Sequence, residues 1–375
     1  MHPSDLPRPD PDALAASRAL LDRIAAELGA ERNWMSFARY MEMTLYEPGL
    51  GYYAGGSTRF GAGGDFVTAP ELSPLFGQTL ARQLQPLLAP GDALLEFGAG
   101  SGALAATLLE ACPGQPYLIL EPSAPLRELQ RERLGSRVQW LDRLPQRFRG
   151  VMLANEVLDA MPTHAVAWTG SGIAERGVCA NEGQLAWSER PAQGVVLPAA
   201  QKIGVELPPS GRYESEIALA ARAWVRTVAA ALERGVLLVV DYGFPQREYY
   251  HPQRSMGTLK CHYRHRTHGD PFHLPGLQDV TAHVDFSALA SAGVEAGLEV
   301  LGYANQAQFL VNCGITEVLA KEDPNDVRRY APQAAVANLL LSPAEMGELF
   351  KVLALGRGIE TPLGGFARGD RSHTL

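Results

Sequence analysis

Apolar positions follow two patterns along this chain of 375 residues. Short, almost uninterrupted apolar runs are typical of buried parallel strands, whereas apolar residues three and four positions apart are typical of amphipathic helices. Strand-like runs occur at 93–97, 117–121, 138–142, 151–154, 236–241 and 298–303. Helical spacing occurs at 12–28, 36–45, 74–88, 103–111, 125–134, 214–232, 286–296, 305–313 and 342–355. This alternation of strands and helices predicts an α/β fold with a mainly parallel sheet.

A different pattern interrupts this alternation after residue 163. Between 164 and 197, short runs of partly alternating apolar and polar residues are separated by Gly170, Gly172, Asn181 and Gly183. Alternation with turn residues between the runs is typical of antiparallel strands. We therefore expect an antiparallel β insertion, which would form a wall of the substrate site or a dimer surface.

The predicted elements divide the chain into three parts. They are a helical N-terminal cap with an active-site loop (1–90), a core (91–320) with the β insertion (163–200) and a long loop (245–285), and a C-terminal helical segment and tail (321–375). In the last part, Ser342 and Pro343 are good helix-capping residues, which predict a helix to about residue 355. Residues 364–375 would form a loose tail.

The strand at 93–97 leads directly into three glycines at alternate positions, Gly98, Gly100 and Gly102. Glycine adopts unusual backbone angles and lets a ligand approach the main chain, and the following helix offers free N–H groups at its N-terminus. The spacing also fits a dinucleotide fingerprint loosely, so the glycines leave NAD open. Glu96, at the strand's end, favours a cationic group, such as the amino group of S-adenosylmethionine, over a pyrophosphate.

A second acid, Glu121, ends the next strand. In open α/β sheets, ligands bind outside the carboxyl ends of the strands. A carboxylate there can accept hydrogen bonds from both ribose hydroxyls, which suits S-adenosylmethionine and NAD equally. After the third strand, Leu141 would flank the adenine ring and Asp142 would meet its exocyclic amine.

Composition narrows the class of protein. Apolar residues make up 46% and charged residues 20%, as in soluble globular enzymes. The net charge of −8 argues against general nucleic-acid binding and leaves open an acidic cleft for a basic substrate. Four scattered cysteines indicate a reducing compartment, and no apolar run reaches the roughly 20 residues that span a bilayer. Because the N-terminus matches neither a signal nor a transit peptide, we expect a cytoplasmic protein of bacterial type.

Six sequence blocks carry a family resemblance, whose matches run from about residue 36 to 313. They are Tyr46-x-Pro48-Gly49-x-Gly51-Tyr52-Tyr53, Gly64-Asp65-Phe66-x-Thr68-Ala69-Pro70-Glu71, Glu96-Phe97-Gly98-Ala99-Gly100-Ser101-Gly102, Asn155-Glu156-Val157-Leu158-Asp159-Ala160-Met161-Pro162, Asp241-Tyr242-Gly243 and Gly257-Thr258-Leu259-x-x-x-Tyr263-x-His265-Arg266-x-His268. Together they resemble the MidA family of class I S-adenosylmethionine-dependent methyltransferases, which includes the mitochondrial methyltransferase that assists assembly of respiratory complex I.

The resemblance implies a particular fold and activity. The fold would be Rossmann-like, with a seven-stranded sheet, helices on both faces, and two strands after 236–241, the last of them antiparallel. The apolar pattern supplies one of these two strands, 298–303. For the eukaryotic members, the resemblance implies methylation of an arginine in a complex I subunit.

In methyltransferases of this class, the end of the fourth strand faces the methyl group and its acceptor. Here that end carries Asn155, Glu156 and Asp159. Carboxylates three residues apart share a side of a helical turn, and carboxylates bind a guanidinium bidentately. We expect the two acids to orient an arginine and to leave one of its nitrogens more nucleophilic, with Asn155 contacting the cofactor as well. Alternatively, one acid caps the following helix and the other forms an ion pair.

Six of the nine histidines lie within 251–283, together with Cys261. Their spacing lacks the paired motifs of a zinc site, so we expect no metal. We expect instead a polar loop over the cofactor or acceptor pocket, as the resemblance implies, with His265 as a proton acceptor near neutral pH. A purely structural loop is the alternative. The residues expected to contact the substrate are Asp65, Glu71, Tyr242 and His268.

The sequence thus predicts an S-adenosylmethionine-dependent methyltransferase that acts on an arginine of a partner protein. The residues expected to hold the cofactor are Glu96, Gly98, Gly100, Gly102, Glu121, Leu141, Asp142 and Asn155. Three other functions stay open. One is methylation of a small molecule or an oxygen nucleophile, which a tight aromatic pocket would favour. Another is an assembly factor that binds the cofactor and acts by protein contact. The third is a nicotinamide enzyme, which would bind NAD in place of S-adenosylmethionine. A homodimer is compatible with the β insertion.

Overall fold

The computed structural model describes residues 6–55 and 68–375, which divide into two compact units. Unit 1 is assembled from Met1–Phe66, Asp159–Ala221 and Gln246–Asp285, and unit 2 from Val67–Leu158, Arg222–Pro245 and Phe286–Leu375. This division differs from the predicted three parts. Residues 68–90, expected in an N-terminal cap, and residues 321–375, expected as a separate C-terminal segment, both belong to unit 2.

Unit 2 is an α/β layer structure. Its strands are β2 (Ala93–Phe97), β3 (Tyr117–Leu120), β4 (Gln139–Leu141), β5 (Phe148–Asn155), β10 (Leu232–Phe244), β15 (Glu299–Asn305) and β16 (Phe350–Arg357). The helices that belong wholly or mostly to it are α3 (Ala69–Leu72), α4 (Pro74–Leu84), α5 (Ala103–Ala111), α6 (Ala124–Leu134), α8 (Leu219–Ala231), α10 (Phe286–Glu295), α11 (Gln306–Asn312), α12 (Ile315–Leu319), α13 (Val327–Leu341) and α14 (Met346–Leu349).

The strands of unit 2 pair in the order β15-β16-β10-β5-β2-β3-β4. The run from β10 to β4 is parallel, whereas β16 is antiparallel to both of its neighbours. The expected α/β sheet with one antiparallel strand after the fifth is therefore confirmed, and its spatial order shows that β16 inserts between β10 and β15.

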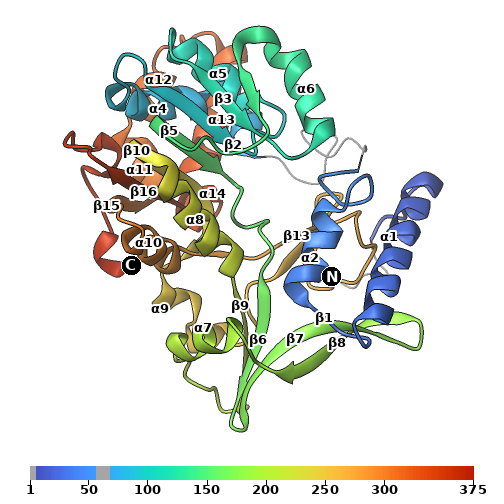
Figure 1. Cartoon of the computed structure of the whole chain (residues 1–375). Helices are drawn as coiled ribbons and strands as arrows, with labels where there is room; N and C mark the ends of the chain where they lie inside the picture. Colours follow the sequence, from blue (N-terminus) through green and yellow to red (C-terminus); the bar gives the residue numbers. More distant parts are fainter. Residues whose placement is uncertain (1–5, 56–67) are drawn as a thin grey trace. The chain divides into compact units, whose positions relative to one another are not determined.

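Helices cover both faces of this sheet (Figure 1). Val151 belongs to a core cluster on one face, together with side chains of α4 and α5. The next residue, Met152, points to the opposite face and is also fully buried. On that second face, Trp224 of α8 packs edge-on against Phe97, with ring centroids 4.9 Å apart. Burial on both faces explains why the central strands are almost continuously apolar.

The sequence prediction was wrong over 342–355, where one long helix was expected. Residues Ser342–Glu345 form a turn, α14 is a single short helix, and Phe350–Arg357 form strand β16. Residues 350–356 are all buried and, apart from Lys351, carry no polar side chain, which suits a strand with neighbours on both sides. β16 supplies the strand that the apolar pattern had not identified.

The predicted loose tail at 364–375 is also wrong. Asp370 accepts a hydrogen bond from the backbone N–H of Tyr303 in β15, at 3.0 Å. Phe366 is buried and packs against Phe309 of α11, with ring centroids 5.2 Å apart. The C-terminal residues therefore cover the edge of the sheet at β15.

Unit 1 contains two antiparallel sheets. The strands of these sheets are β1 (Met35–Ser36), β6 (His164–Thr169), β7 (Gly172–Asn181), β8 (Gln184–Pro191), β9 (Arg212–Ile217), β11 (Lys260–Tyr263), β12 (Arg266–His268) and β13 (Asp279–Thr281). A further short strand, β14 (Val284–Asp285), belongs to neither of these two sheets. Its helices are α1 (Pro11–Ala30), α2 (Phe37–Tyr46), α7 (Val196–Ile203) and α9 (Gln246–Tyr249). The larger sheet runs β1-β7-β6-β9, with β8 paired to β7, and the smaller one runs β12-β11-β13.

The β insertion is confirmed, and it is larger than expected. The predicted helix at 214–232 begins only at Leu219, because Arg212–Ile217 form strand β9 beside β6. The long loop at 245–285 likewise contains the three strands of the smaller sheet. Both errors arose where a short strand stands next to a stronger helical or polar pattern.

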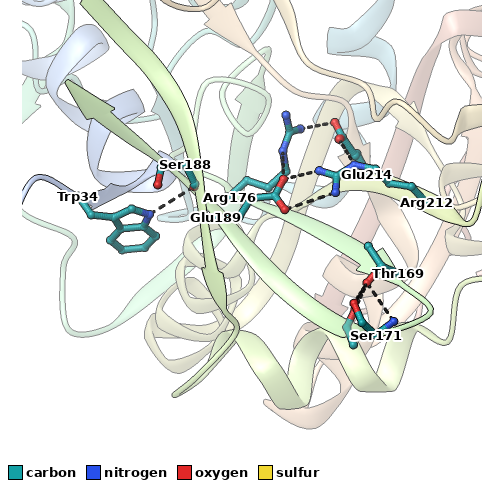
Figure 2. A network of polar contacts seen from close by, with 9 residues as sticks. Trp34, Thr169, Ser171, Arg176, Ser188, Glu189, Arg212 and Glu214 are labelled. Carbon is teal, nitrogen blue, oxygen red and sulfur yellow. Dashed lines mark hydrogen bonds and ion pairs between the residues drawn. The ribbon is translucent and has the colours of Figure 1, made fainter. Parts of the chain in front are cut away.

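An ion network joins three strands of the larger sheet (Figure 2). Arg212 of β9 pairs with Glu189 of β8 and with Glu214, whose Oε1 lies 2.6 Å from Arg212 Nε. Arg176 of β7 also pairs with Glu214 and lies over the ring of Trp187, 4.3 Å from its centroid. Arg176 and Glu214 are largely shielded from water, and each has a second partner, Glu189 for Arg176 and Arg212 for Glu214, so both buried charges are paired within the network.

Within the part of the chain that the structure describes, no helix is both long and apolar enough to cross a membrane.

The assignment of β16 to the core predicts a large difference between two substitutions. Leu353, in the middle of β16, is fully buried, whereas Val311 on α11 is 47% exposed. Leu353→Ala should lower the free energy of unfolding by about 2–5 kcal/mol, and Val311→Ala by no more than about 0.5 kcal/mol. Urea unfolding of the two variants measures this, and equal, small effects would contradict a central β16.

Candidate functional site

The carboxyl ends of three parallel strands meet at one edge of the sheet in unit 2. Phe97 of β2 lies in register with the last residue of β3 and with Ala154 of β5. Gly98, Glu121 and Asn155 therefore follow at the same edge, as the sequence predicted from the strand order. Such an edge is where open α/β sheets bind their ligands.

The turn after β2 needs its glycines. Gly98, Gly100 and Gly102 have φ angles of 58°, 55° and 80°, in the left-handed region that other residues rarely adopt. A Cβ on Gly98 would lie 3.2 Å from Val157, and one on Gly102 would lie 3.2 Å from Leu134. The first glycine therefore allows the segment after β5 to pack against the turn, and the third allows α6 to do so.

Glu96, the residue before the last of β2, precedes this turn and is 3% exposed. Tyr117 donates a hydrogen bond of 2.6 Å to its Oε2. Burial raises the pKa of Glu96 to about 7, the Tyr117 hydrogen bond opposes this rise, and the charge of Glu121 adds to it. At neutral pH this carboxyl is therefore partly protonated, and a bound cation would favour its ionised form.

Glu121 is equally buried at the end of β3. Its Oε1 accepts a hydrogen bond from Ser123 N at 3.0 Å, and its Oε2 accepts one from Gln130 Nε2 at 3.3 Å. Burial raises the pKa of Glu121 to about 7, against the hydrogen bonds from Ser123, Gln130 and the Gly100 backbone, which lower it. The carboxylate is thus oriented by the protein before any ligand binds.

Gln130 is a residue that the sequence analysis missed. Its side chain also donates to the carbonyl of Gly100, at 2.9 Å, and accepts from the indole of Trp140, at 2.9 Å. The sequence did contain a signal, because Gln130 interrupts the apolar face of α6 between Leu126 and Leu134. A polar side chain within a buried helical stripe needs hydrogen-bond partners.

Leu141 is the last residue of β4 and Asp142 follows it, at the same edge of the sheet. Arg127 donates to Asp142 Oδ1 at 2.7 Å and also binds the Leu141 carbonyl. The Asp142 side chain is 90% exposed, so this ion pair contributes little to stability. The role predicted for Asp142, binding of an adenine amine, stays a prediction.

Glu71 of α3 contacts the glycine turn. Ser101 donates a hydrogen bond to Glu71, and Arg133 donates to Ser101 Oγ at 2.6 Å. Arg133 Nη1 also lies 3.9 Å from Glu71 Oε1. Glu71 was predicted to contact the substrate, and the structure places it where it holds the turn.

The segment after β5 has a strained backbone at Glu156. This residue has a φ of 53°, which costs a residue with a Cβ about 1–2 kcal/mol. Its N–H donates to Val240 O at 2.9 Å, and its Oε1 accepts from Asn155 Nδ2 at 3.1 Å. Among the described residues, Asn155 Oδ1 has no hydrogen-bond partner although it is buried. A buried acceptor of this kind is available to a ligand.

Asp241, at the carboxyl end of β10, fixes the backbone beside this segment. It is fully buried and accepts hydrogen bonds from Leu158 N at 3.0 Å and from Tyr242 N at 2.9 Å. The ring of Tyr242 packs edge-on against Phe350, with centroids 5.5 Å apart. The structure thus gives Asp241 a structural role, while substrate contact by Tyr242 stays a prediction.

Asp159 belongs to unit 1, whereas Glu156 belongs to unit 2. Residues 156–162 form bends and turns, so the helical turn expected to align the two acids is absent from this segment. Asp159 is 6% exposed, and its carbonyl accepts from Ala282 N at 3.0 Å. Its joint action with Glu156 therefore stays a prediction.

The histidines of unit 1 lie in different environments. His265 is exposed in the two-residue turn between β11 and β12, where it and Arg264 both have positive φ. His268 is 5% exposed on β12, opposite Cys261. Burial, together with the neighbouring His273, lowers the pKa of His268. Asp65, the remaining predicted substrate contact, lies outside the described residues.

Over residues 6–55 and 68–375, no group of three or more His, Cys, Asp or Glu side chains is placed to hold a metal ion.

The edge formed by β2, β3 and β5 fits a nucleoside that carries a cationic amino acid. The left-handed glycines leave the backbone open to a ligand, Glu96 and Glu121 are buried carboxyls, and Asn155 offers a buried acceptor. Fold and site together define a class I S-adenosylmethionine-dependent methyltransferase.

Known proteins agree with this class. Residues 75–304 match the family described as "Putative S-adenosyl-L-methionine-dependent methyltransferase". The chain is 29% identical to the mitochondrial protein arginine methyltransferase NDUFAF7 of Danio rerio, over 90% of this chain and 87% of that protein. It is 28% identical to human NDUFAF7, over 86% of this chain and 80% of that protein.

The chain is more similar to a protein of solved structure than to these two mitochondrial relatives. A Burkholderia thailandensis protein, crystallised with S-adenosyl-homocysteine, is 52% identical with a TM-score of 0.95, over 99% of this chain and 100% of that one. The chain belongs to the MidA family of S-adenosylmethionine-dependent methyltransferases. Its cofactor is S-adenosyl-L-methionine.

Two glycine substitutions separate backbone strain from loss of the cofactor site. Gly102 and Gly114 have φ angles of 80° and 83°, but a Cβ has open space only at Gly114. Both alanine variants should lose about 1–2 kcal/mol of stability to strain. Gly102→Ala alone should weaken S-adenosylhomocysteine binding, by at least tenfold, because the turn must shift away from Leu134. Calorimetric titration checks this, and equal binding by the two variants would contradict the assignment.

Cofactor affinity should fall as the pH falls through about 7. Below that pH, Glu96 and Glu121 take up protons that must be released before they can pair with an ammonium or orient toward ribose. The folding stability of the unliganded protein depends on pH in the opposite direction. Because folding raises both pKa values from 4.5 to about 7, the two carboxyls favour the folded state most below pH 4.5. This contribution to stability is lost as the pH rises through about 7.

Titrations of S-adenosylhomocysteine from pH 6 to 8 measure this dependence. The affinity of Glu121→Gln should vary less with pH than that of the unmodified protein. A flat profile in the unmodified protein would contradict the prediction.

Proposed function

We propose that this methyltransferase acts on an arginine side chain of a partner protein. Its curated relatives in zebrafish and human are named protein arginine methyltransferases. The observation within this chain that carries the proposal is Glu156, a carboxylate held in a left-handed backbone conformation at the carboxyl end of β5. Backbone strain of this kind is concentrated at functional sites, and it aims a single side chain.

The cofactor would be held by groups on three strand ends. Glu96 would face the cationic amino group, the turn at Gly98, Gly100 and Gly102 would contact the amino-acid part, and Glu121 would accept hydrogen bonds from the ribose. The rest of the cofactor would be surrounded by Leu141, Asp142 and Asn155. When bound, the cofactor supplies a methyl group on a sulfonium, and the residues of the chain have to position an acceptor beside it.

Glu156 suits a guanidinium acceptor. A carboxylate binds the planar guanidinium through paired N–H···O contacts, which fixes the direction of its nitrogens. The hydrogen bond from Asn155 restrains the Glu156 carboxylate, and Val157 packs beside Gly98, so the acid lies next to the glycine turn. Fixed geometry of this kind is the main requirement of an in-line displacement.

Further acceptor roles stay predictions from the sequence: Asp159 as a second carboxylate, His265 as a proton acceptor, and Asp65, Glu71, Tyr242 and His268 as substrate contacts. Two of these roles have less support than the others. His265 is exposed in a turn, and the Glu71 carboxylate already accepts a hydrogen bond from Ser101.

We further propose a cytoplasmic location in a bacterium. The four cysteines are free thiols, as is usual in a reducing compartment, and the Burkholderia relative covers almost the whole chain. A homodimer through the antiparallel sheet stays a prediction from the sequence.

The test is a pair of glutamate variants with matched backbones. Glu156 and Glu182 have φ angles of 53° and 51°, and Glu182 lies in the exposed β7–β8 turn. Each protein is incubated with lysate and S-adenosylmethionine labelled in its methyl group. Glu156→Gln should transfer at least a hundredfold less label to protein, with S-adenosylhomocysteine affinity kept within about threefold, while Glu182→Gln behaves as the unmodified protein.

Other outcomes would favour a different function. Full transfer by Glu156→Gln would overturn the role of this acid. Label recovered in small molecules would favour a small-molecule or oxygen methyltransferase. Cofactor binding without any transfer, combined with capture of a partner protein, would favour an assembly factor.

A further inference from the structure

One buried amide lies between two parts of the cofactor site. Gln130 of α6 is fully buried, and its three hydrogen bonds reach three separate elements. Its Nε2 donates to Gly100 O at 2.9 Å and to Glu121 Oε2 at 3.3 Å. Its Oε1 accepts from Trp140 Nε1 at 2.9 Å. A carboxamide has two N–H donors and one carbonyl acceptor, so each polar group of this side chain is used.

Two of these contacts reach groups that we assign to different portions of the cofactor. Gly100 belongs to the turn proposed to receive the amino-acid part, and Glu121 is proposed to receive the ribose. Helix α6 is packed close to the turn, because a Cβ on Gly102 would lie 3.5 Å from Gln130 Cγ. The bond from Trp140 pairs the amide oxygen, while the amide nitrogen is held by its own two acceptors, Gly100 O and Glu121 Oε2.

We propose that Gln130 is a positioning residue that sets the spacing between the glycine turn and Glu121, so that both fit one S-adenosylmethionine molecule. A site whose parts are already in place loses less free energy to ordering when the ligand binds. The advantage applies to ligands that contact both parts at once. The proposal rests on the cofactor site and does not depend on arginine as the acceptor.

The two roles of Gln130, positioning and mere packing, predict different binding patterns. Gln130→Met keeps the length and volume of the side chain and removes all three hydrogen bonds. Trp140→Phe removes only the indole's bond and leaves the bonds to Gly100 and Glu121. S-Adenosylhomocysteine contacts both parts of the site, whereas 5′-methylthioadenosine lacks the amino-acid part. Each compound is titrated calorimetrically into both variants, and thermal melting reports their stability.

In Gln130→Met, S-adenosylhomocysteine affinity should fall about tenfold, as expected for the loss of a buried hydrogen bond of about 1.4 kcal/mol. The affinity for 5′-methylthioadenosine should fall at least threefold less. Trp140→Phe should bind both compounds within about twofold of the unmodified protein, even if its melting temperature drops. Unchanged binding by Gln130→Met, or an equal loss for the two compounds, would overturn the proposal and leave a packing role.

A second variant, Gln130→Glu, covers the case in which Gln130→Met does not fold. The carboxyl group that this substitution introduces can donate a hydrogen bond only when it is protonated, and when ionised it repels Glu121. The charged groups near this position include Glu121 and Glu96, Arg127, Arg133, and Arg131, which lies over the Trp140 ring. The S-adenosylhomocysteine affinity of Gln130→Glu should rise from pH 8 to pH 6, opposite to the unmodified protein. The same slope in both proteins would contradict the proposal.

Discussion

The cofactor site depends on the parallel register of β2 with β3 and β5. Because Phe97 lies level with the ends of both neighbouring strands, three chain segments that are distant in the sequence start at one edge. The chain then has to turn from β2 into α5 within five residues, and only left-handed glycines allow this while α6 and Val157 pack against them. Register and turn together bring a backbone surface, Glu121 and Glu156 into one small region.

The same arrangement has an electrostatic cost that binding can reverse. Glu96 and Glu121 lie at the carboxyl ends of β2 and β3, shielded from water, and burial raises the pKa of each to about 7. Tyr117, Ser123 and Gln130 offset part of that cost by hydrogen bonding. A ligand that brings an ammonium group and two hydroxyls would stabilise the ionised carboxyls further. The protein therefore carries a site whose charges are satisfied best when the cofactor is present.

Much of unit 2 could be predicted from the sequence, because its strands are buried on both faces and its glycine turn follows a fixed spacing. Strand β16 could not, because Ser342 and Pro343 suggested a helix and the pairing that makes Phe350–Arg357 a strand involves residues more than a hundred positions away. Gln130 was missed because its partners, Gly100 and Trp140, come together only in the fold. Asp159 was expected beside Glu156 on a helical turn, and the segment contains no helix.

The central claim is that this site delivers a methyl group to arginine. The most direct measurement is amino-acid analysis of protein labelled by the purified enzyme with methyl-labelled S-adenosylmethionine. After complete hydrolysis, we predict that the label is recovered as methylated arginine. Recovery in methyl esters, in methylated lysine or histidine, or only in small molecules would contradict the claim, even though the fold and the cofactor site would stand.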